Sequence, residues 1–291
     1  MPPQRLPELD RARASVILLP LHDSMTDKEL DYVIDRLKAF APGVGAGRGF
    51  GAVAARGGRE PMARDLVILG AGGNAHDVLD IVEALNDAGG NDRWEPVGYL
   101  DDTRPAGSEY LGLPVLGSLR DAGKFQRNGF ISAIRNEAVY RKAPDILALT
   151  GLALDSYVTL VHPAAGVSKR ARVGRGVYVN FGASVAAGVT LGDHSSVGPG
   201  CVIGHESVVD DYAIIAAGAV ISGGVWIGRA CYLGSGSLVK QKLRVGEGAL
   251  VGMGAVVLRD VAADSVVVGN PARPLERKSA HLRRRTEFRE T

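Results

Sequence analysis

The chain has 291 residues, enough for two modest domains, and 46% of them are hydrophobic, so a buried core is possible. A formal net charge of +2 gives no sign of a nucleic-acid partner, and two cysteines are too few for a disulfide framework. No apolar run approaches the roughly 20 residues of a membrane span, and the short run Val16–Leu19 follows acidic residues, unlike a signal peptide. We therefore expect a soluble, cytoplasmic protein without a membrane or nucleic-acid partner.

The first segment, residues 1–62, divides into a helix-forming part and a glycine-rich part. Thr26 can cap a helix and Glu29 can complete its capping box, whereas residues 41–58 have the composition of a flexible linker. Residues 15–40 resemble the C-terminal end of pyridoxal-phosphate-dependent nucleotide-sugar aminotransferases, without the catalytic core of that family. We therefore assign this extension no catalysis. Alternatively, the helix docks on the next domain through the apolar stripe of Leu30, Val33, Ile34 and Leu37.

The second segment, residues 63–155, opens with a strand, a glycine turn and a helix. Asp65–Leu69 has the composition of a buried strand, and Gly70-Ala-Gly72-Gly73-Asn74-Ala75 follows it and matches the G-x-G-x-x-A fingerprint. Glycines at such a turn let a phosphate approach the backbone at the start of a helix. The pattern predicts a Rossmann-like α/β domain.

Two more strands are predicted in this domain, and polar residues follow each of them. Residues 96–100 precede Asp101 and Asp102, and residues 130–134 precede Arg135. A nicotinamide dehydrogenase is the main alternative for such a domain. Its coenzyme normally requires two mononucleotide-binding halves, and this segment has room for about one.

A period of six residues runs through the third segment, residues 156–278. From Val161 to Val257, every sixth residue is Val, Ile or Leu, seventeen times in succession. An α-helix has a period near 3.6, so a period of six indicates short strands that point this residue inward and turn at a corner. Three strands would close a coil of about 18 residues, and coils would stack roughly 4.8 Å apart. The sequence therefore predicts a parallel β-helix of about five and a half coils, with no long loop in residues 161–258.

Small residues fill further positions of the repeat. The position after the inward residue is often glycine, which we expect to relieve the backbone where the chain turns. Cys201 and Cys231 stand at the small position four residues after the inward one, so both are expected to be buried. Tyr178 and Trp226 are expected to leave apolar surface outside the coils for a second subunit to cover. The basic tail, residues 279–291, is expected to be a solvated end.

His205 is the candidate for chemistry within the coils. It stands two residues after the inward Ile203, so its side chain should point away from the core, in the middle coils where subunits would meet. Histidine is the usual general base near neutral pH, and a solvated surface histidine is the alternative. His194 follows Asp193 at a corner and is expected to be exposed. With only these two histidines in the central coils, the three-histidine zinc site of hexapeptide carbonic anhydrases is not expected.

Residues 65–275 resemble the sugar acyltransferase family that includes bacillosamine and perosamine N-acetyltransferases and sialic-acid O-acetyltransferases. The resemblance implies left-handed coils, acetyl-CoA as cosubstrate, a reaction without a metal, and a homotrimer. The stretches that carry it are Leu69-Gly-Ala-Gly-Gly-Asn-Ala-His76, Gly98-Tyr-Leu-Asp-Asp102, Gly204-His205-Glu206, Ala217-Gly-Ala-Val-Ile-Ser-Gly-Gly-Val225 and Gly269-Asn-Pro-Ala-Arg273.

The resemblance also implies roles for individual residues. His205 corresponds to the general base of the family and Glu206 to its acidic neighbour. Adjacent residues of a flat strand point to opposite sides, so contact between these two requires a bend or a neighbouring subunit. The residues implied for the nucleotide sugar are Gly72, Gly73, Asn74, Asp101 and Asp102, and those implied for acetyl-CoA, between adjacent coils of the trimer, are Ile214, Ser235 and Met253.

Three positions depart from the pattern of the family. Ile214 stands where relatives often have a second histidine, Arg135 where they often have glycine, and Gly198 where they have a polar residue. These departures bear on the identity of the substrate more than on the type of reaction.

The function that we expect is acetyl-CoA-dependent N-acetylation of a nucleotide-linked amino sugar. The aminotransferase-like N-terminus favours it, because an aminotransferase would make the amine that is acylated. O-acetylation of a sugar such as sialic acid and a non-catalytic β-helix assembly module stay open. The sequence also leaves open which sugar and nucleotide are bound and how long the acyl chain is.

Overall fold

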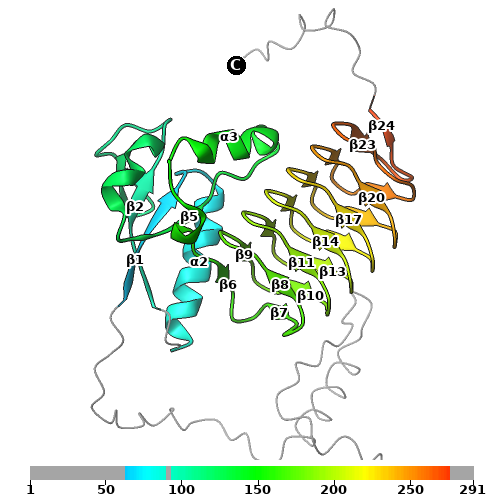
Figure 1. Cartoon of the computed structure of the whole chain (residues 1–291), viewed down its shortest axis with the longest axis horizontal. Coiled ribbons are helices and arrows are strands. Elements are labelled where there is room, and N and C mark those ends of the chain that lie inside the picture. The colour runs from blue at the N-terminus through cyan, green and yellow to red at the C-terminus, as the bar shows by residue number, and fades with distance from the viewer. Residues whose placement is uncertain (1–62, 90–92, 276–291) are drawn as a thin grey trace, which may run out of the picture. The chain divides into compact units, whose positions relative to one another are not determined.

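The computed structural model describes residues 63–89 and 93–275, which form an α/β part and a stack of coils (Figure 1). The expectations for residues 1–62 and for the tail at 279–291 concern segments outside the described residues. Within the described ranges, no helix combines the length and the hydropathy needed to span a bilayer.

A five-stranded sheet and five helical segments make up the α/β part. They are β1 (Arg64–Leu69), α2 (Asn74–Asp87), β2 (Trp94–Leu100), β3 (Glu109–Tyr110), β4 (Leu113–Gly117), η2 (Leu119–Phe125), β5 (Gly129–Ser132), η3 (Tyr140–Lys142), α3 (Ala143–Ala148) and η4 (Leu154–Ser156). The strand order is β3-β4-β2-β1-β5, and all neighbours are parallel except β3 and β4. Both faces of β1 are covered, because residues 66–69 are fully buried, and α2 packs on one face through Val78 and Ile81.

The predicted succession of strand, glycine turn and helix is confirmed. The second predicted strand begins two residues earlier than expected, at Trp94, and the third ends at Ser132 rather than at Ile134. The Ser132 hydroxyl accepts the amide of Ile134 at 3.2 Å, and this local hydrogen bond ends the ladder where the chain turns toward the coils.

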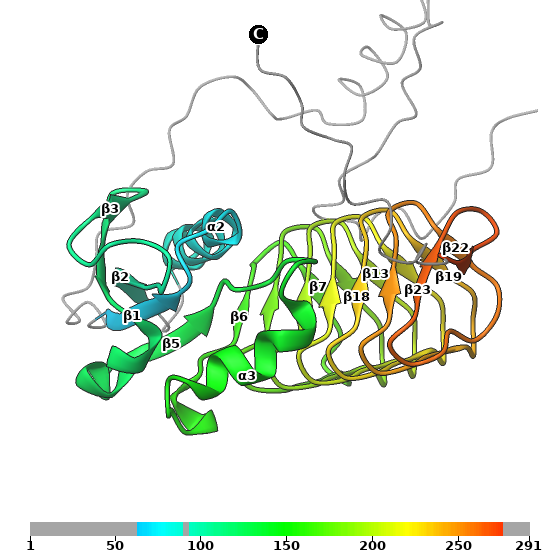
Figure 2. The same ribbon diagram turned by 90° about the horizontal axis from the view of Figure 1, so that it is seen from above.

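Seventeen two-residue strands, β6 to β22, confirm the period of six residues. Each of the first fourteen, β6 to β19, pairs in parallel with the strand 18 residues further along, so three flat faces form the stack. Figure 2 shows the coils side by side. Face I holds β6 (Leu160–Val161), β9 (Tyr178–Val179), β12 (Ser196–Val197), β15 (Ile214–Ile215), β18 (Tyr232–Leu233) and β21 (Leu250–Val251). Face II holds β7 (Gly166–Val167), β10 (Ser184–Val185), β13 (Val202–Ile203), β16 (Val220–Ile221), β19 (Leu238–Val239) and β22 (Val256–Val257). Face III holds β8 (Arg172–Val173), β11 (Thr190–Leu191), β14 (Val208–Val209), β17 (Trp226–Ile227) and β20 (Arg244–Val245).

Two more strands extend face I beyond the last full coil. β23 (Val266–Val268) pairs in parallel with β21, and β24 (Arg273–Pro274) folds back antiparallel to β23. No long loop interrupts residues 161–258, as the unbroken period predicts.

The chain turns at three corners in every coil, and each corner recurs every 18 residues. The I–II corner carries Phe181-Gly182, Pro199-Gly200, Ala217-Gly218, Ser235-Gly236 and Met253-Gly254. The II–III corner carries Ala187-Gly188, His205-Glu206, Gly223-Gly224 and Gln241-Lys242. The III–I corner carries Arg175-Gly176, Asp193-His194, Asp211-Tyr212, Arg229-Ala230 and Glu247-Gly248.

The inward residues of the repeat form one apolar core along the axis of the stack. Cys201 and Cys231 are fully buried in it, as their small position in the repeat predicts. Val161, Val167 and Val173 in the first coil are only partly buried, because a coil at the end of the stack has a neighbour on one side.

The glycines of the repeat serve two purposes, and one of them differs from the prediction. Gly204, directly after an inward residue, is not at positive φ; a Cβ atom there would lie 2.5 Å from the amide nitrogen of Gly223 in the next coil. Glycine is therefore required by the close approach of the coils. Backbone relief occurs instead in the corners, for example at Gly218, where φ is +68°.

Candidate active site

The backbone of the glycine turn is open at two residues. Gly72 and Gly73 are exposed, and a Cβ atom at either one would have no neighbour within 4 Å. Gly70 has the opposite surroundings, since its φ is +97° and a Cβ would lie 2.6 Å from Cγ1 of Ile134. The turn therefore has a tightly packed base at Gly70 and an accessible rim, next to the first residue of α2.

Asp101 organises this turn through its carboxylate. Its Oδ2 accepts the amide of Ala71 at 2.7 Å, and its Oδ1 accepts the amides of Thr103 and Arg104 and the Thr103 hydroxyl. Burial alone would raise the pKa of Asp101, but these hydrogen bonds outweigh it and lower the pKa. Asp102 has a similar structural task, because its Oδ1 accepts the amide of Leu119 at 2.9 Å.

Arg104 also lies at the turn and was not singled out from the sequence. Its Nε donates to the carbonyl of Ala71 at 2.8 Å, and its guanidinium lies 4.0 Å from the ring centroid of Tyr110. This places a positive charge beside the exposed glycines. Its position two residues after Asp102, just beyond the end of the second strand, is the signal that could have identified it.

A cavity of about 300 Å³ lies between the α/β part and face I. It brings together residues that the sequence assigned to two different ligands, namely Asn74 for the nucleotide sugar and Ile214 and Ser235 for acetyl-CoA. Ile214 is only 6% exposed, and Met253 lies one coil beyond Ser235 on the I–II corner with 77% of its surface exposed. The full lining is Asn74, Asp77, Arg135, Tyr178, Ser196, Gly198, Pro199, Ile214, Ile215, Ala216, Ala217, Tyr232 and Ser235.

Tyr178 belongs to the wall of this cavity, and the expectation that it leaves apolar surface outside the coils is wrong. It is buried, because the α/β part covers the first strands of face I and Tyr178 joins the apolar cluster of Leu66 and Ile81. Trp226, the other aromatic residue of that expectation, is half-buried, and the guanidinium of Arg244 lies 4.4 Å from the centroid of its ring.

His205 and Glu206 form a pair at the II–III corner. Nδ1 of His205 is 3.6 Å from Oε2 of Glu206, and their side chains are 72% and 79% exposed. The required bend is present within one chain, because Glu206 has a φ of +59°. The imidazole lies over Gly223 of the next coil, where a Cβ atom would come within 2.6 Å of Nε2.

This pair does not meet the cavity within one chain. The cavity opens on face I, whereas the II–III corner is the one corner of the prism that does not border face I. The candidate residues of a single chain therefore fall into two separate groups.

His194 is buried, which corrects the expectation that it lies exposed at a corner. Only 5% of its surface is exposed, because Tyr157 and Tyr212 cover its ring at centroid distances of 4.4 and 4.9 Å. Burial, with a contribution from the charge of Arg135, lowers the pKa of His194 to about 4. A histidine of this kind is neutral near pH 7 and packs as an aromatic residue.

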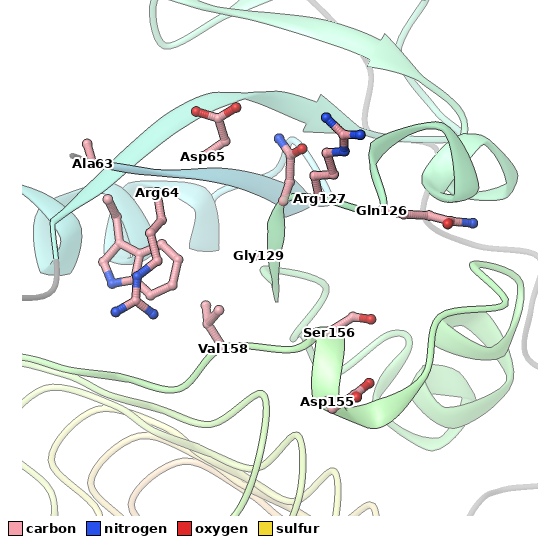
Figure 3. Close-up of a pocket in the computed structure, with 11 residues that line it drawn as sticks. Ala63, Arg64, Asp65, Gln126, Arg127, Gly129, Asp155, Ser156 and Val158 are labelled. Carbon is pink, nitrogen blue, oxygen red and sulfur yellow. The ribbon is translucent and has the colours of Figure 1, made fainter.

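A larger and more open cavity, of about 630 Å³, lies at the amino ends of β1 and β5 (Figure 3). Charged residues of both signs line it, among them Arg64, Asp65, Arg127 and Asp155. None of the sequence-predicted site residues is in its lining. Ligands of open parallel sheets bind at the carboxyl ends of the strands, so we place the candidate site at the cavity beside Asn74.

Two family models match parts of the chain. The one described as "PglD N-terminal domain" matches residues 65–143, and the one described as "Bacterial transferase hexapeptide (six repeats)" matches residues 170–205. Among curated protein sequences, none matches the chain.

Solved structures match both parts together. The acetyltransferase domain of PglB from Neisseria gonorrhoeae FA1090 is 31% identical, with a TM-score of 0.64, over 73% of this chain and 100% of that one. A histidine-to-asparagine mutant of perosamine N-acetyltransferase from Caulobacter crescentus, in complex with CoA and GDP-perosamine, is 28% identical, with a TM-score of 0.62, over 73% and 97%. WeeI from Acinetobacter baumannii AYE is 26% identical, with a TM-score of 0.60, over 72% and 99%. The PglB domain is also known in complex with acetyl coenzyme A.

Proposed function

The chain belongs to the family of sugar acyltransferases with a left-handed β-helix, and from this membership we propose that it N-acetylates a nucleotide-linked amino sugar with acetyl-CoA. The observation that carries the proposal is the cavity of about 300 Å³, which is lined by Asn74 of the α/β part and by Ile214 and Ser235 of the coils. A transferase must bring donor and acceptor together, and this cavity is lined by one residue expected to bind the sugar and by two expected to bind acetyl-CoA.

The diphosphate of a nucleotide sugar suits the glycine turn. The exposed backbone of Gly72 and Gly73 precedes the first turn of α2, and the amino end of a helix attracts negative charge. Arg104 adds a positive charge beside the turn. Asp101 and Asp102 hold the surrounding loops by accepting backbone amides, so their proposed contribution to the site is to shape it.

His205 is proposed as the general base. Its imidazole would take a proton from the amine as the nitrogen attacks the thioester carbon, since a protonated amine has no lone pair for attack. A C–N bond then forms, the C–S bond breaks, and the imidazolium would return the proton to the CoA thiolate as it leaves. Glu206, 3.6 Å from Nδ1, would stabilise the imidazolium that forms, and backbone amides of the coils would stabilise the oxyanion.

A homotrimer is proposed because one chain does not unite these groups. His205 stands on the II–III corner, away from the cavity on face I, and its side chain is largely exposed. Three prisms packed about a threefold axis would bring the II–III corner of one subunit to the cavity of its neighbour. Each site would then use the turn of one chain and the base of the next.

The experiment is a thiol-release screen with acetyl-CoA and UDP-, GDP- and TDP-linked 4-amino sugars. We expect turnover with at least one of them and none with the corresponding 4-hydroxy sugars. Release of thiol with sialic acid or with a 4-hydroxy sugar alone would identify an O-acetyltransferase instead. No release with any acceptor, together with no binding of acetyl-CoA, would favour an assembly module.

A further inference from the structure

The guanidinium of Arg135 is buried at the junction of the α/β part and the coils. Arg135 is only 5% exposed, and its guanidinium lies 4.7 Å from the ring centroid of Tyr178. Within the described residues it has no carboxylate at ion-pair distance. A buried cation of this kind needs several good hydrogen bonds to offset its loss of water.

Three carbonyl groups from three separate places supply those hydrogen bonds. Nε donates to Ser132 at 3.0 Å, Nη2 donates to Gly176 at 2.8 Å, and Nη1 donates to His194. Gly176 and His194 occupy the III–I corner in consecutive coils, with φ values of +65° and +57°. One planar fork therefore ties the end of β5 to the first two coils of this corner.

The backbone of Arg135 makes a further contact, on the side of the candidate site. Its carbonyl accepts Nδ2 of Asn74 at 2.6 Å, and Arg135 and Asn74 both line the cavity of about 300 Å³. A continuous path of hydrogen bonds thus runs from the coils through Arg135 to the first residue of α2. Ile214 and Ser235 of the coils line the same cavity.

We propose that Arg135 is a positioning residue, which holds Asn74 and the glycine turn at a fixed distance from face I and so sets the width of the cavity. The inference rests on the proposed function, because the width of the cavity would determine how the nucleotide sugar is aligned with the acyl donor. Lysine would not replace it, since a single ammonium lacks the planar fork that reaches three carbonyls at once.

A second arginine offers a matched control. Nε of Arg141 donates to Gly248 at 2.7 Å and its Nη2 to Asp264 at 2.8 Å, so it also ties the α/β part to carbonyls of the coils. These carbonyls belong to the far end of the stack, and Arg141 does not line the cavity. Loss of Arg141 should weaken attachment without moving Asn74.

The test compares Arg135→Met, Arg135→Lys and Arg141→Met by steady-state kinetics and thermal unfolding. We expect Arg135→Met to raise KM for the nucleotide sugar about tenfold and to lower kcat by up to about 100-fold, the size of effect that a misplacement near 1 Å can have. KM for acetyl-CoA should change less than about twofold, and Arg135→Lys should behave like Arg135→Met. Arg141→Met should lower Tm while both KM values and kcat stay within about twofold.

A double-mutant cycle with Asn74→Ala separates positioning from a general loss of stability. If Arg135 acts through Asn74, Arg135→Met should raise KM for the sugar no further in the Asn74→Ala background. If the effects of Arg135→Met and Asn74→Ala on KM for the sugar are additive, the proposal is overturned. The same kinetic profile for Arg135→Met and Arg141→Met would also overturn it. Should Arg135→Met fail to fold, the same cycle is run with Arg135→Lys.

A failure of the proposed function has a different signature, namely a wild-type protein without turnover. The positioning role is then decided by hydrogen exchange of the amides at the start of α2. Faster exchange at residues 74–78 in Arg135→Met than in Arg141→Met would support it, and equal exchange would end it.

Discussion

The imidazole of His194 lies nearly parallel to the ring of Tyr212 in the next coil, with 4.9 Å between ring centroids and 20° between ring planes. Tyr157 makes a T-shaped contact with the same imidazole, and the carbonyl of His194 accepts a hydrogen bond from Arg135. The histidine therefore belongs to the junction between the two parts of the molecule.

The first prediction concerns the pH dependence of stability. The pKa of His194 is lowered from 6.5 to about 4 in the folded chain, by burial first and then by Arg135, with Asp193 acting in the opposite direction. The unfolded chain thus binds the proton more tightly, so stability is complete above about pH 6.5 and is lost as the pH falls toward 4. The loss should reach at most about 3 kcal/mol.

Urea unfolding at a series of pH values measures this loss. His194→Asn is the control, because asparagine does not titrate and tolerates the positive φ of +57° at this position. The variant should be less stable at pH 7 but should have a flatter stability profile between pH 4 and 6.5. Parallel profiles for the two proteins would contradict the burial of a neutral imidazole.

The second prediction concerns His205. Replacing it with alanine should lower turnover by about two to four orders of magnitude, the usual contribution of a general base. Because 72% of its side chain is exposed, Tm should hardly change. Near-normal turnover of His205→Ala, measured by thiol release, would rule out the base role.

The third prediction compares two glycines that face each other across adjacent coils. In Gly223→Ala the new methyl group would lie 2.6 Å from Nε2 of His205, a mobile side chain that can move away, so turnover should fall while Tm is kept. In Gly204→Ala the methyl group would lie 2.5 Å from the backbone nitrogen of Gly223, which has nowhere to move. This variant should lose about 1–3 kcal/mol of stability. Thermal unfolding and thiol release on both variants measure the difference, and equal losses of Tm would contradict it.

The fourth prediction tests whether sites are shared between subunits. Gly72→Asp places a carboxylate at the turn proposed for the diphosphate, and His205→Ala removes the base, so each variant alone should be inactive. In co-refolded trimers mixed at random, about one site in four should combine an intact turn from one chain with an intact histidine from the next. Activity near one quarter of wild type is expected. Mixtures that stay inactive, or an active monomer in sedimentation, would contradict the shared site.

The sequence predicts the coils well because their period is strictly local. The same inward residue every six positions implies the strand spacing, the core and the burial of Cys201 and Cys231. The glycine turn is equally local, as its strand, turn and helix follow one another without a break. The local bend at Glu206 was one of two options that the sequence left open.

The errors concern contacts between segments far apart in the chain. Tyr178 and His194 were expected outside because the repeat alone turns them outward. The α/β part buries Tyr178, and Tyr157 and Tyr212 cover His194, and none of these contacts has a counterpart in a six-residue period. Arg135 is 41 residues from Gly176 and 59 from His194, so no spacing rule joins them. The role of the glycine at Gly204 was misassigned because it depends on the next coil, 18 residues on.

The fastening of the α/β part to both ends of the III–I corner has a consequence for how the molecule unfolds. A stack in which each coil touches only its neighbours should fray from its free end, one coil at a time. Here Arg135 joins the first two coils, and Tyr140 and Arg141 join Gly248 near the last. Because these contacts attach the α/β part to coils near both ends of the stack, the coils between them should unfold together. The described part of the chain should therefore lose its structure in one cooperative transition.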